Sequence, residues 1–255
     1  MSGKQEREKR RQERLAAESQ VSNQDRRKKL LQIGAGAAFL AVVVVVVLIV
    51  VASGGDDGGD ATNIKDVALV EEELTGLEQN GMVLGDPKAP VEVIEFGDLQ
   101  CPICKAVSEE ALPPVFEGAV AQGQAKLSFR NFIVITEQSE TAGAAAIAAG
   151  EQGRGWNFIE LFYRNQGKEG SGYVTDEFLT AIAKGAGVKD IAKWNEDRNS
   201  EKVKNEVRET DEEAQQLGFT GTPSFAIKGP GTDGLELIGS IGSAEELESA
   251  IDAAS

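Results

Sequence analysis

Hydrophobic residues are spread very unevenly along this chain of 255 residues. Residues 2–29 are almost wholly polar, whereas residues 30–51 contain no charged side chain. A helix over that apolar stretch rises about 1.5 Å per residue and extends about 33 Å, enough to cross a hydrocarbon core of about 30 Å. We therefore predict a transmembrane helix over residues 30–52. The alternative is a cleaved signal peptide, but the apolar region of a signal peptide usually spans only about 7–15 residues.

The charges on either side of this segment predict its orientation. The run RRKK at residues 26–29 precedes it, and Asp56 and Asp57 follow it. Positive charges are retained on the cytoplasmic side of a membrane. Residues 1–29 are thus predicted to be a cytoplasmic basic tail of a single-pass protein of the cell membrane, with the rest of the chain extracytoplasmic. Residues 53–80 begin with a Gly- and Asp-rich stretch and are predicted to be a tether.

From residue 81 the hydrophobic pattern is that of a folded domain. VEVIEF at residues 91–96 and KLSFRNFIVI at 126–135 are typical of strands. Alanine-rich and amphipathic helical segments fill about 138–217, and two short strands and a final helix follow. This order predicts an α/β domain over residues 81–255, with a mixed central sheet flanked by helices and a helical insertion.

The charge balance narrows the possible partners. Residues 1–29 hold ten Lys and Arg against five Asp and Glu, which leaves sixteen basic and thirty-seven acidic residues in the remainder. An acidic body repels phosphate backbones, so we expect no nucleic-acid partner. The chain contains no histidine, which removes the most common general base and metal ligand. We expect neither a metal site nor a cofactor.

Both cysteines of the chain lie in one motif, CPIC, at Cys101 and Cys104. A disulfide that closes so small a loop stabilises a fold by only about 2 kcal/mol, and a structural zinc site needs four Cys or His ligands. A redox-active dithiol remains. The motif follows a strand and opens a helix, whose N-terminus stabilises a thiolate. We expect Cys101 to be exposed and to attack, and Cys104, one turn on, to be buried and to resolve the mixed disulfide.

Two further features accompany the dithiol. Alternation along the strand at 91–96 places Glu95 on one face with its apolar neighbours, so Glu95 is either a buried acid near the cysteines or an acid that reaches solvent at the strand end. Pro223, in the sequence GTPSF, precedes a later strand. From the sequence alone a trans peptide bond is favoured there, because only about 5–6% of X–Pro bonds are cis.

Taken together, these motifs resemble the thioredoxin superfamily. The resemblance rests on CPIC after a strand, Glu95 six residues before Cys101, Thr222-Pro223 before a distal strand, and a helical block between the two halves. The run GDPKAPVEVIEFGDLQCPIC is similar to the active-site entry of the DsbA-like branch, which comprises extracytoplasmic thiol–disulfide oxidoreductases. The resemblance covers about residues 81–255 and implies a thioredoxin fold.

The resemblance also implies roles for individual residues. Cys101 and Cys104 would be the redox-active pair, Glu95 the buried acid, and Pro223 a cis proline lying against the dithiol. Thr222 would offer backbone hydrogen bonds to an extended substrate, and Pro102 and Ile103 would face that substrate. DsbA itself has a histidine that helps to stabilise its thiolate where this chain has Ile103. We therefore expect a milder reduction potential than that of DsbA.

The expected activity is oxidation of thiols in substrate proteins. A quinone-linked membrane thiol oxidase, of the DsbB or vitamin K epoxide reductase type, would reoxidise the pair, and residues 30–52 would contact the lipid bilayer. Two alternatives remain open: a thiol reductase, for example in cytochrome maturation, and a thioredoxin-fold binding module without catalysis.

Overall fold

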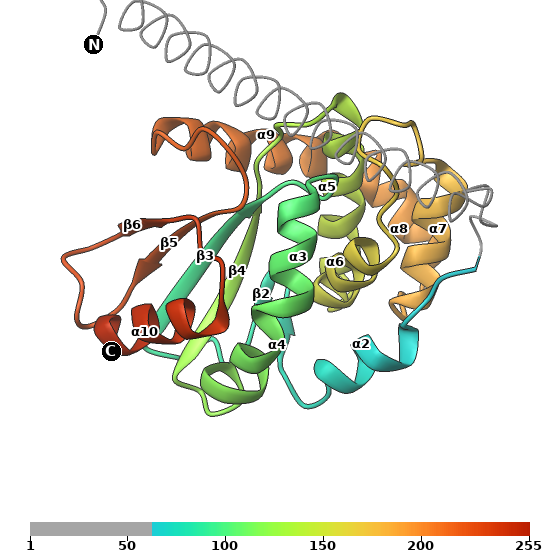
Figure 1. Ribbon diagram of the computed structural model, residues 1–255. Helices are drawn as coiled ribbons and strands as arrows, with labels where there is room; N and C mark the ends of the chain where they lie inside the picture. The colour runs from blue at the N-terminus through green and yellow to red at the C-terminus, as the bar shows by residue number, and fades with distance from the viewer. Residues whose placement is uncertain (1–62) are drawn as a thin grey trace, which may run out of the picture. The chain divides into compact units, whose positions relative to one another are not determined.

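The structure is a computed structural model that describes residues 63–255 (Figure 1). The predicted cytoplasmic tail and membrane helix, residues 1–52, lie outside the described residues, as does the first part of the predicted tether. Among the helices of residues 63–255, none has the length and hydrophobicity needed to cross a membrane.

One mixed sheet forms the centre of the described domain, with the strand order β1-β2-β4-β3-β5-β6. The strands are β1 (Gln79–Asn80), β2 (Val83–Leu84), β3 (Val91–Gly97), β4 (Ala125–Asn131), β5 (Ser224–Lys228) and β6 (Glu236–Gly239). β3 and β4 are parallel, whereas the other neighbouring strands are antiparallel. The two longest strands thus lie side by side at the centre, as expected for β3 with its β-branched and aromatic residues.

Helices cover both faces of this sheet (Figure 1). α3 (Pro102–Glu110), α4 (Leu112–Val115) and α10 (Ala244–Ala254) lie on one face, where they pack with Val91 and Val93 of β3. α9 (Glu201–Gln216) lies on the other face, where Ala214 packs with Ile94 and Phe96. The side chains of β3 therefore alternate between two buried layers, as the sequence predicts. This arrangement confirms the predicted mixed sheet flanked by helices.

The helix that follows the cysteines ends where its prolines predict. α3 stops at Glu110, and Pro113 and Pro114 lie in the separate short helix α4. A π-helical turn over Phe116–Val120 then leads toward β4. Proline lacks the N–H that would continue the helical hydrogen bonds and clashes with the preceding turn.

The helical insertion lies between β4 and β5, as the sequence predicts. It consists of α5 (Glu137–Gly150), α6 (Gly155–Arg164), α7 (Asp176–Gly185), α8 (Ile191–Arg198) and α9. Side chains of Thr136, Thr175, Asp190 and Ser200 accept backbone N–H groups at the starts of α5, α7, α8 and α9. Each such cap is worth about 1 kcal/mol. Small alanine side chains let α5 pack closely against α6, α8 and α9.

The folded domain begins before residue 81, which corrects the predicted end of the tether. Val70 of α2 (Val67–Glu73) is buried, and so is Leu74, the residue that follows the helix. β1 pairs with β2. Val70 and Leu74 are four residues apart and thus share one helical face. The strand β1, at two residues, is too short to show a recognisable pattern in the sequence. Residues 67–80 are part of the domain.

Candidate active site

Cys101 caps the N-terminus of α3, directly after the turn that follows β3. Its backbone is extended, and Pro102 occupies the first helical position, where a missing N–H is tolerated. The N–H of Cys104 donates a hydrogen bond to Cys101 Sγ at 3.4 Å. Both cysteines are free thiols in the structure. The strand, the proline and the helix start thus place the two sulfurs one helical turn apart, as the sequence predicts.

The expected exposure of Cys101 is wrong. Cys101 is only 4% exposed and Cys104 is fully buried, whereas Ile103 between them is 61% exposed. Cys101 is enclosed because its Sγ lies against the loop that carries Thr222, whose carbonyl oxygen it contacts at 3.5 Å. Pro102 is exposed. The motif therefore presents Pro102 and Ile103 to solvent, with the first sulfur recessed behind them.

The loop before β5 lies beside the dithiol. The peptide bond between Thr222 and Pro223 is cis, as the resemblance implies and contrary to the expectation from the sequence alone. Pro223 is buried and Thr222 is partly buried. The hydroxyl oxygen of Thr222 is buried and has no hydrogen-bond partner among the described residues. The hydrogen bond from Cys101 Sγ to the Thr222 carbonyl brings together two segments that are 121 residues apart in the sequence.

Glu95 is a buried acid, so the alternative in which it reaches solvent at the strand end is wrong. It lies on β3 opposite Phe129 of β4 and Phe225 of β5, and it is 3% exposed. Burial, together with the nearby charges of Glu160 and Cys101, raises the pKa of Glu95 to about 8. One of its carboxyl oxygens, Oε1, has no hydrogen-bond partner among residues 63–255. Glu95 is therefore mostly uncharged at neutral pH.

The two thiols differ strongly in acidity. The hydrogen bond with the Cys104 thiol, the contact with Thr222 and the backbone N–H groups of Cys104 and Ile103 outweigh burial and lower the pKa of Cys101 to about 6. Burial raises the pKa of Cys104 well above its usual range, and the interactions with Cys101 and Glu95 add to this shift. At neutral pH Cys101 is thus the thiolate and Cys104 the thiol, which gives one nucleophile and one protonated partner.

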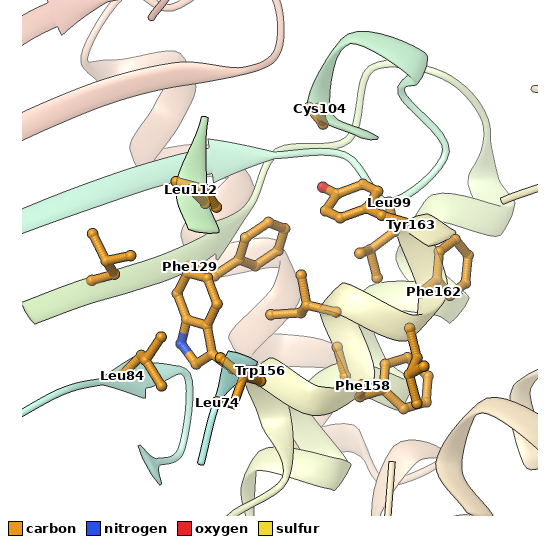
Figure 2. Packing of buried hydrophobic residues seen from close by; sticks show 14 of the residues in the cluster. Leu74, Leu84, Leu99, Cys104, Leu112, Phe129, Trp156, Phe158, Phe162 and Tyr163 are labelled. Atoms are coloured by element: carbon orange, nitrogen blue, oxygen red, sulfur yellow. The ribbon is translucent and has the colours of Figure 1, made fainter. Parts of the chain in front are cut away.

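The helical insertion holds the turn that leads into the cysteines. The Tyr163 hydroxyl of α6 donates to the Asp98 carbonyl oxygen at 3.4 Å. Gln166, just after α6, donates to the carbonyl oxygens of Leu99 at 2.8 Å and Cys101 at 3.1 Å. Figure 2 shows Tyr163 and Leu99 near the turn that carries Cys104. The backbone around Cys101 is therefore fixed by side chains that come from the insertion.

The Asp98 carboxylate fixes the same turn from the other side. It accepts the N–H groups of Gln100, Val134 and Ile135, at 2.8, 2.9 and 2.9 Å. Asp98 is 1% exposed. A buried carboxylate with three N–H donors is well satisfied, and it joins the turn before Cys101 to the segment that follows β4.

Sequence reasoning missed several polar residues at this site, among them Asp98, Gln166 and Glu160. Glu160 of α6 is fully buried and accepts a hydrogen bond from Ser108 of α3 at 2.8 Å. One signal was present in the sequence: Glu160 lies four residues after Trp156 and three before Tyr163, hence on the apolar face of α6. Both aromatic residues are fully buried. An acid that lies between aromatic residues on the apolar face of a helix predicts a buried carboxyl group.

A mixed sheet flanked by helices, with a CxxC dithiol at the start of a helix and a cis proline beside it, defines the thioredoxin-fold class of redox proteins. The thioredoxin family model matches residues 77–253. The "Probable disulfide bond formation protein D" of Bacillus anthracis is 35% identical over 149 residues, which cover 57% of this chain and 69% of that protein.

Solved structures agree in fold. The oxidised crystal structure of BdbD from Bacillus subtilis has a TM-score of 0.60 at 23% identity and covers 69% of this chain and 96% of that one. A thioredoxin-like oxidoreductase from Silicibacter pomeroyi DSS-3 has a TM-score of 0.54 at 26% identity and covers 74% of this chain and 96% of that one. This chain belongs to the thioredoxin family. Within it, the chain is a DsbA-like thiol–disulfide oxidoreductase.

Proposed function

We propose that this enzyme oxidises the thiols of substrate proteins outside the cytoplasm, through the disulfide of Cys101 and Cys104. The observation that supports the direction is the position of Cys101 at the N-terminus of α3, where its Sγ accepts the N–H of Cys104 and its pKa is lowered to about 6. A stabilised thiolate favours the reduced form of the enzyme, and an enzyme with a stable reduced form takes electrons from its substrates. The relatives named for disulfide bond formation support the same direction.

Each turnover consists of two exchange steps. A substrate thiolate attacks Cys101 Sγ, the bond between the two enzyme sulfurs breaks, and Cys104 leaves with the electron pair. A second substrate thiolate then attacks the substrate sulfur of the mixed disulfide and releases Cys101 as a thiolate. The substrate has gained a disulfide, and the enzyme has gained two electrons. Cys101 is the attacked sulfur because it is the better leaving group in the second step and is less deeply buried than Cys104.

Glu95 provides the proton for the leaving sulfur. The pKa of Cys104 is raised well above its usual range by burial, so its thiolate takes up a proton as it forms. Glu95 has a pKa raised to about 8 by burial and is the acid whose charge interacts with Cys104. In the reverse reaction Glu95 takes that proton back. An acid with a pKa near the working pH performs both steps well.

Substrate binding takes place at the exposed rim of the dithiol. Ile103 is 61% exposed and Pro102 is also exposed, so both offer apolar surface next to Cys101. The loop that contains Thr222 and the cis bond to Pro223 lies against the sulfur of Cys101. In this proposal the backbone of Thr222 forms hydrogen bonds with an extended peptide, which packs against Pro223. This geometry suits an unfolded segment with a cysteine better than a folded surface.

The remaining proposals concern the surroundings of the enzyme. Residues 30–52 anchor the chain in the cell membrane with the N-terminus in the cytoplasm, as the charges on either side of that segment support. The catalytic domain then lies outside, where disulfides persist. A quinone-linked membrane thiol oxidase is the proposed partner that removes electrons from the reduced pair.

The reduction potential tests the direction. The pKa of about 6 for Cys101 lies between the values of thioredoxin, about 7, and DsbA, about 3.5. We therefore expect equilibration with glutathione to give a potential between about −270 and −120 mV. Alkylation of cell extracts quenched in acid should find the pair mostly oxidised. A potential below about −270 mV and a pair kept reduced in cells would show a reductase instead. A Cys101→Ala variant that retains its function in cells would show a binding module.

A further inference from the structure

α6 carries a second buried acid that the exchange steps do not use. Glu160 is fully buried. Its Oε2 accepts a hydrogen bond from the Ser108 hydroxyl at 2.8 Å, and its Oε1 has no partner among the described residues. A carboxyl group that is removed from water and only half satisfied destabilises the fold when it ionises. Its presence in the core therefore calls for a role.

Ser108 links Glu160 to the dithiol. Ser108 lies on α3 four residues after Cys104, and both side chains face the interior. Residues four apart on a helix are neighbours on one face, about 6 Å apart along the axis. The carboxyl group of Glu160 thus lies beside the helical turn that follows Cys104, on the same buried side of α3.

Glu95 approaches the same region from the sheet. It points to the face that α3 covers, and the charge of Glu160 is the largest influence on its pKa after burial. The pKa of Glu160 is itself raised to about 8, by burial first, while Ser108 and Arg164 lower it in part. Two acids that are buried near each other cannot both ionise easily, because each charge disfavours the other. Acids that repel each other in this way lose their protons in two coupled steps.

Other charged groups also influence Glu160. Arg164 of α6 pairs with Glu73 of α2 at 2.7 Å, and Lys105 pairs with Glu109 on α3. Glu73 and Glu109 raise the pKa of Glu160, and Arg164 lowers it. The other elements in contact with α6 pack with uncharged side chains: the alanines of α5, Phe178 and Ile182 of α7, Gln79 of β1 and Met82 next to β2.

We propose that Glu160 is a positioning residue of the active site, whose ionised carboxylate keeps the neighbouring acid Glu95 protonated at alkaline pH so that Cys104 can receive a proton when the disulfide opens. The inference rests on the proposed function, in which Glu95 supplies that proton. The proton passes from the Glu95 carboxyl group to Cys104 Sγ as the sulfur–sulfur bond breaks, and Glu95 later regains a proton from solvent. Glu160 acts by repulsion: once it is ionised, Glu95 holds its proton to a higher pH.

The test is an infrared titration of the protonated carboxyl band in the reduced full-length chain. The wild type should show two buried carboxyl groups that titrate in separate steps above pH 6. Glu160→Gln keeps the acceptor for Ser108, removes the charge, and should leave one step at lower pH than the upper step of the wild type. Glu206→Gln, a partly buried acid on α9 on the far face of the sheet, is the matched control and should change neither step.

Kinetics then test the connection to the dithiol. The rate at which glutathione thiolate opens the disulfide should decrease at alkaline pH. The midpoint of this decrease should lie at a lower pH in Glu160→Gln than in the wild type. A midpoint that is lower by one pH unit reduces the rate about tenfold above it. In a Glu95→Gln background, Glu160→Gln should have no further effect on this profile, because Glu160 acts through Glu95.

Three outcomes would overturn the proposal. The first is a single remaining step in Glu160→Gln at the pH of the upper wild-type step. The second is an equal effect of Glu160→Gln on the rate with and without Glu95. The third applies if Glu160→Gln does not fold. Coupling is reciprocal, so the titration step of Glu160 should move to lower pH in Glu95→Gln, and a step that does not move would refute the coupling. The titration needs no turnover. A wild type that shows the coupled steps but exchanges no disulfides would therefore refute the proposed function and leave the coupling intact.

Discussion

Glu95→Gln should make the reduced protein more stable above neutral pH. Glu95 is 3% exposed, and burial raises its pKa from 4.5 to about 8. At about 1.4 kcal/mol per pH unit, that rise corresponds to about 5 kcal/mol at most. Below pH 4.5 the acid is neutral in both the folded and the unfolded chain and has no effect on stability. Between pH 4.5 and 8 the unfolded chain releases the proton and the folded chain retains it, so the free energy of unfolding decreases as the pH rises.

Glutamine cannot ionise, so the variant lacks this decrease. The free energies of unfolding of wild type and variant should be similar near pH 4.5. The variant should then gain up to about 5 kcal/mol by pH 8, with a constant difference above. The assay is urea unfolding of the reduced chain at several pH values, followed by tryptophan fluorescence. The only two tryptophans of the chain, Trp156 and Trp194, are fully buried, so the signal reports on this domain.

An exposed acid provides the control. Glu212→Gln on α9 removes one carboxylate from the surface and should change the pH dependence little. Parallel stability curves for wild type and Glu95→Gln between pH 5 and 8 would refute the reasoning, since they would mean that Glu95 ionises in the fold as readily as in water. A free energy of unfolding that increases with pH in the wild type but not in Glu95→Gln would show that the fold stabilises Glu95 as an anion.

Three further predictions concern the same region. Cys104→Ala keeps the backbone N–H but removes the thiol, whose hydrogen bond contributes most to the acidity of Cys101, so the pKa of Cys101 should rise from about 6 toward 9; thiolate absorbance against pH measures this change, and an unchanged midpoint would contradict the prediction. Gly97→Ala places a methyl group 2.6 Å from the ring of Phe129 and should destabilise the domain by about 1–3 kcal/mol in urea unfolding. Gln166→Ala removes two hydrogen bonds and should destabilise by about 1–3 kcal/mol, whereas exposed Lys168→Ala should not.

Short-range patterns were sufficient to predict much of the domain. β5 is the strand predicted to follow Pro223, and its apolar residues are bounded by that proline and by Gly229. The helix after Cys101 and its end before Pro113 also follow from local chemistry. Alternation along the strand placed Glu95 with its apolar neighbours but left open whether it reaches solvent, and the structure shows that it is buried.

Features that depend on distant segments could not be predicted from the residues alone. Cys101 is recessed because Thr222, 121 residues later, lies against its sulfur. A short-range sequence pattern cannot reveal a contact between residues so far apart in the chain. The hydrogen bonds from Tyr163 and Gln166 to the turn before the cysteines depend on how α6 packs. The cis bond at Pro223 was implied only by the resemblance. Tertiary contacts of this kind decide the chemistry of the sulfurs.

If residues 30–52 anchor the chain in a membrane, as we propose, the early start of the domain limits how far the active site can lie from that membrane. α2 begins at Val67, so residues 53–66 are all that would separate a membrane span ending at residue 52 from the folded body. Those fourteen residues cover about 50 Å when fully extended, against about 100 Å for the twenty-eight residues of the predicted tether. A dithiol held this close to the membrane would act on chains that emerge at the membrane surface and on partners embedded in it. It could not follow proteins that diffuse away from the membrane.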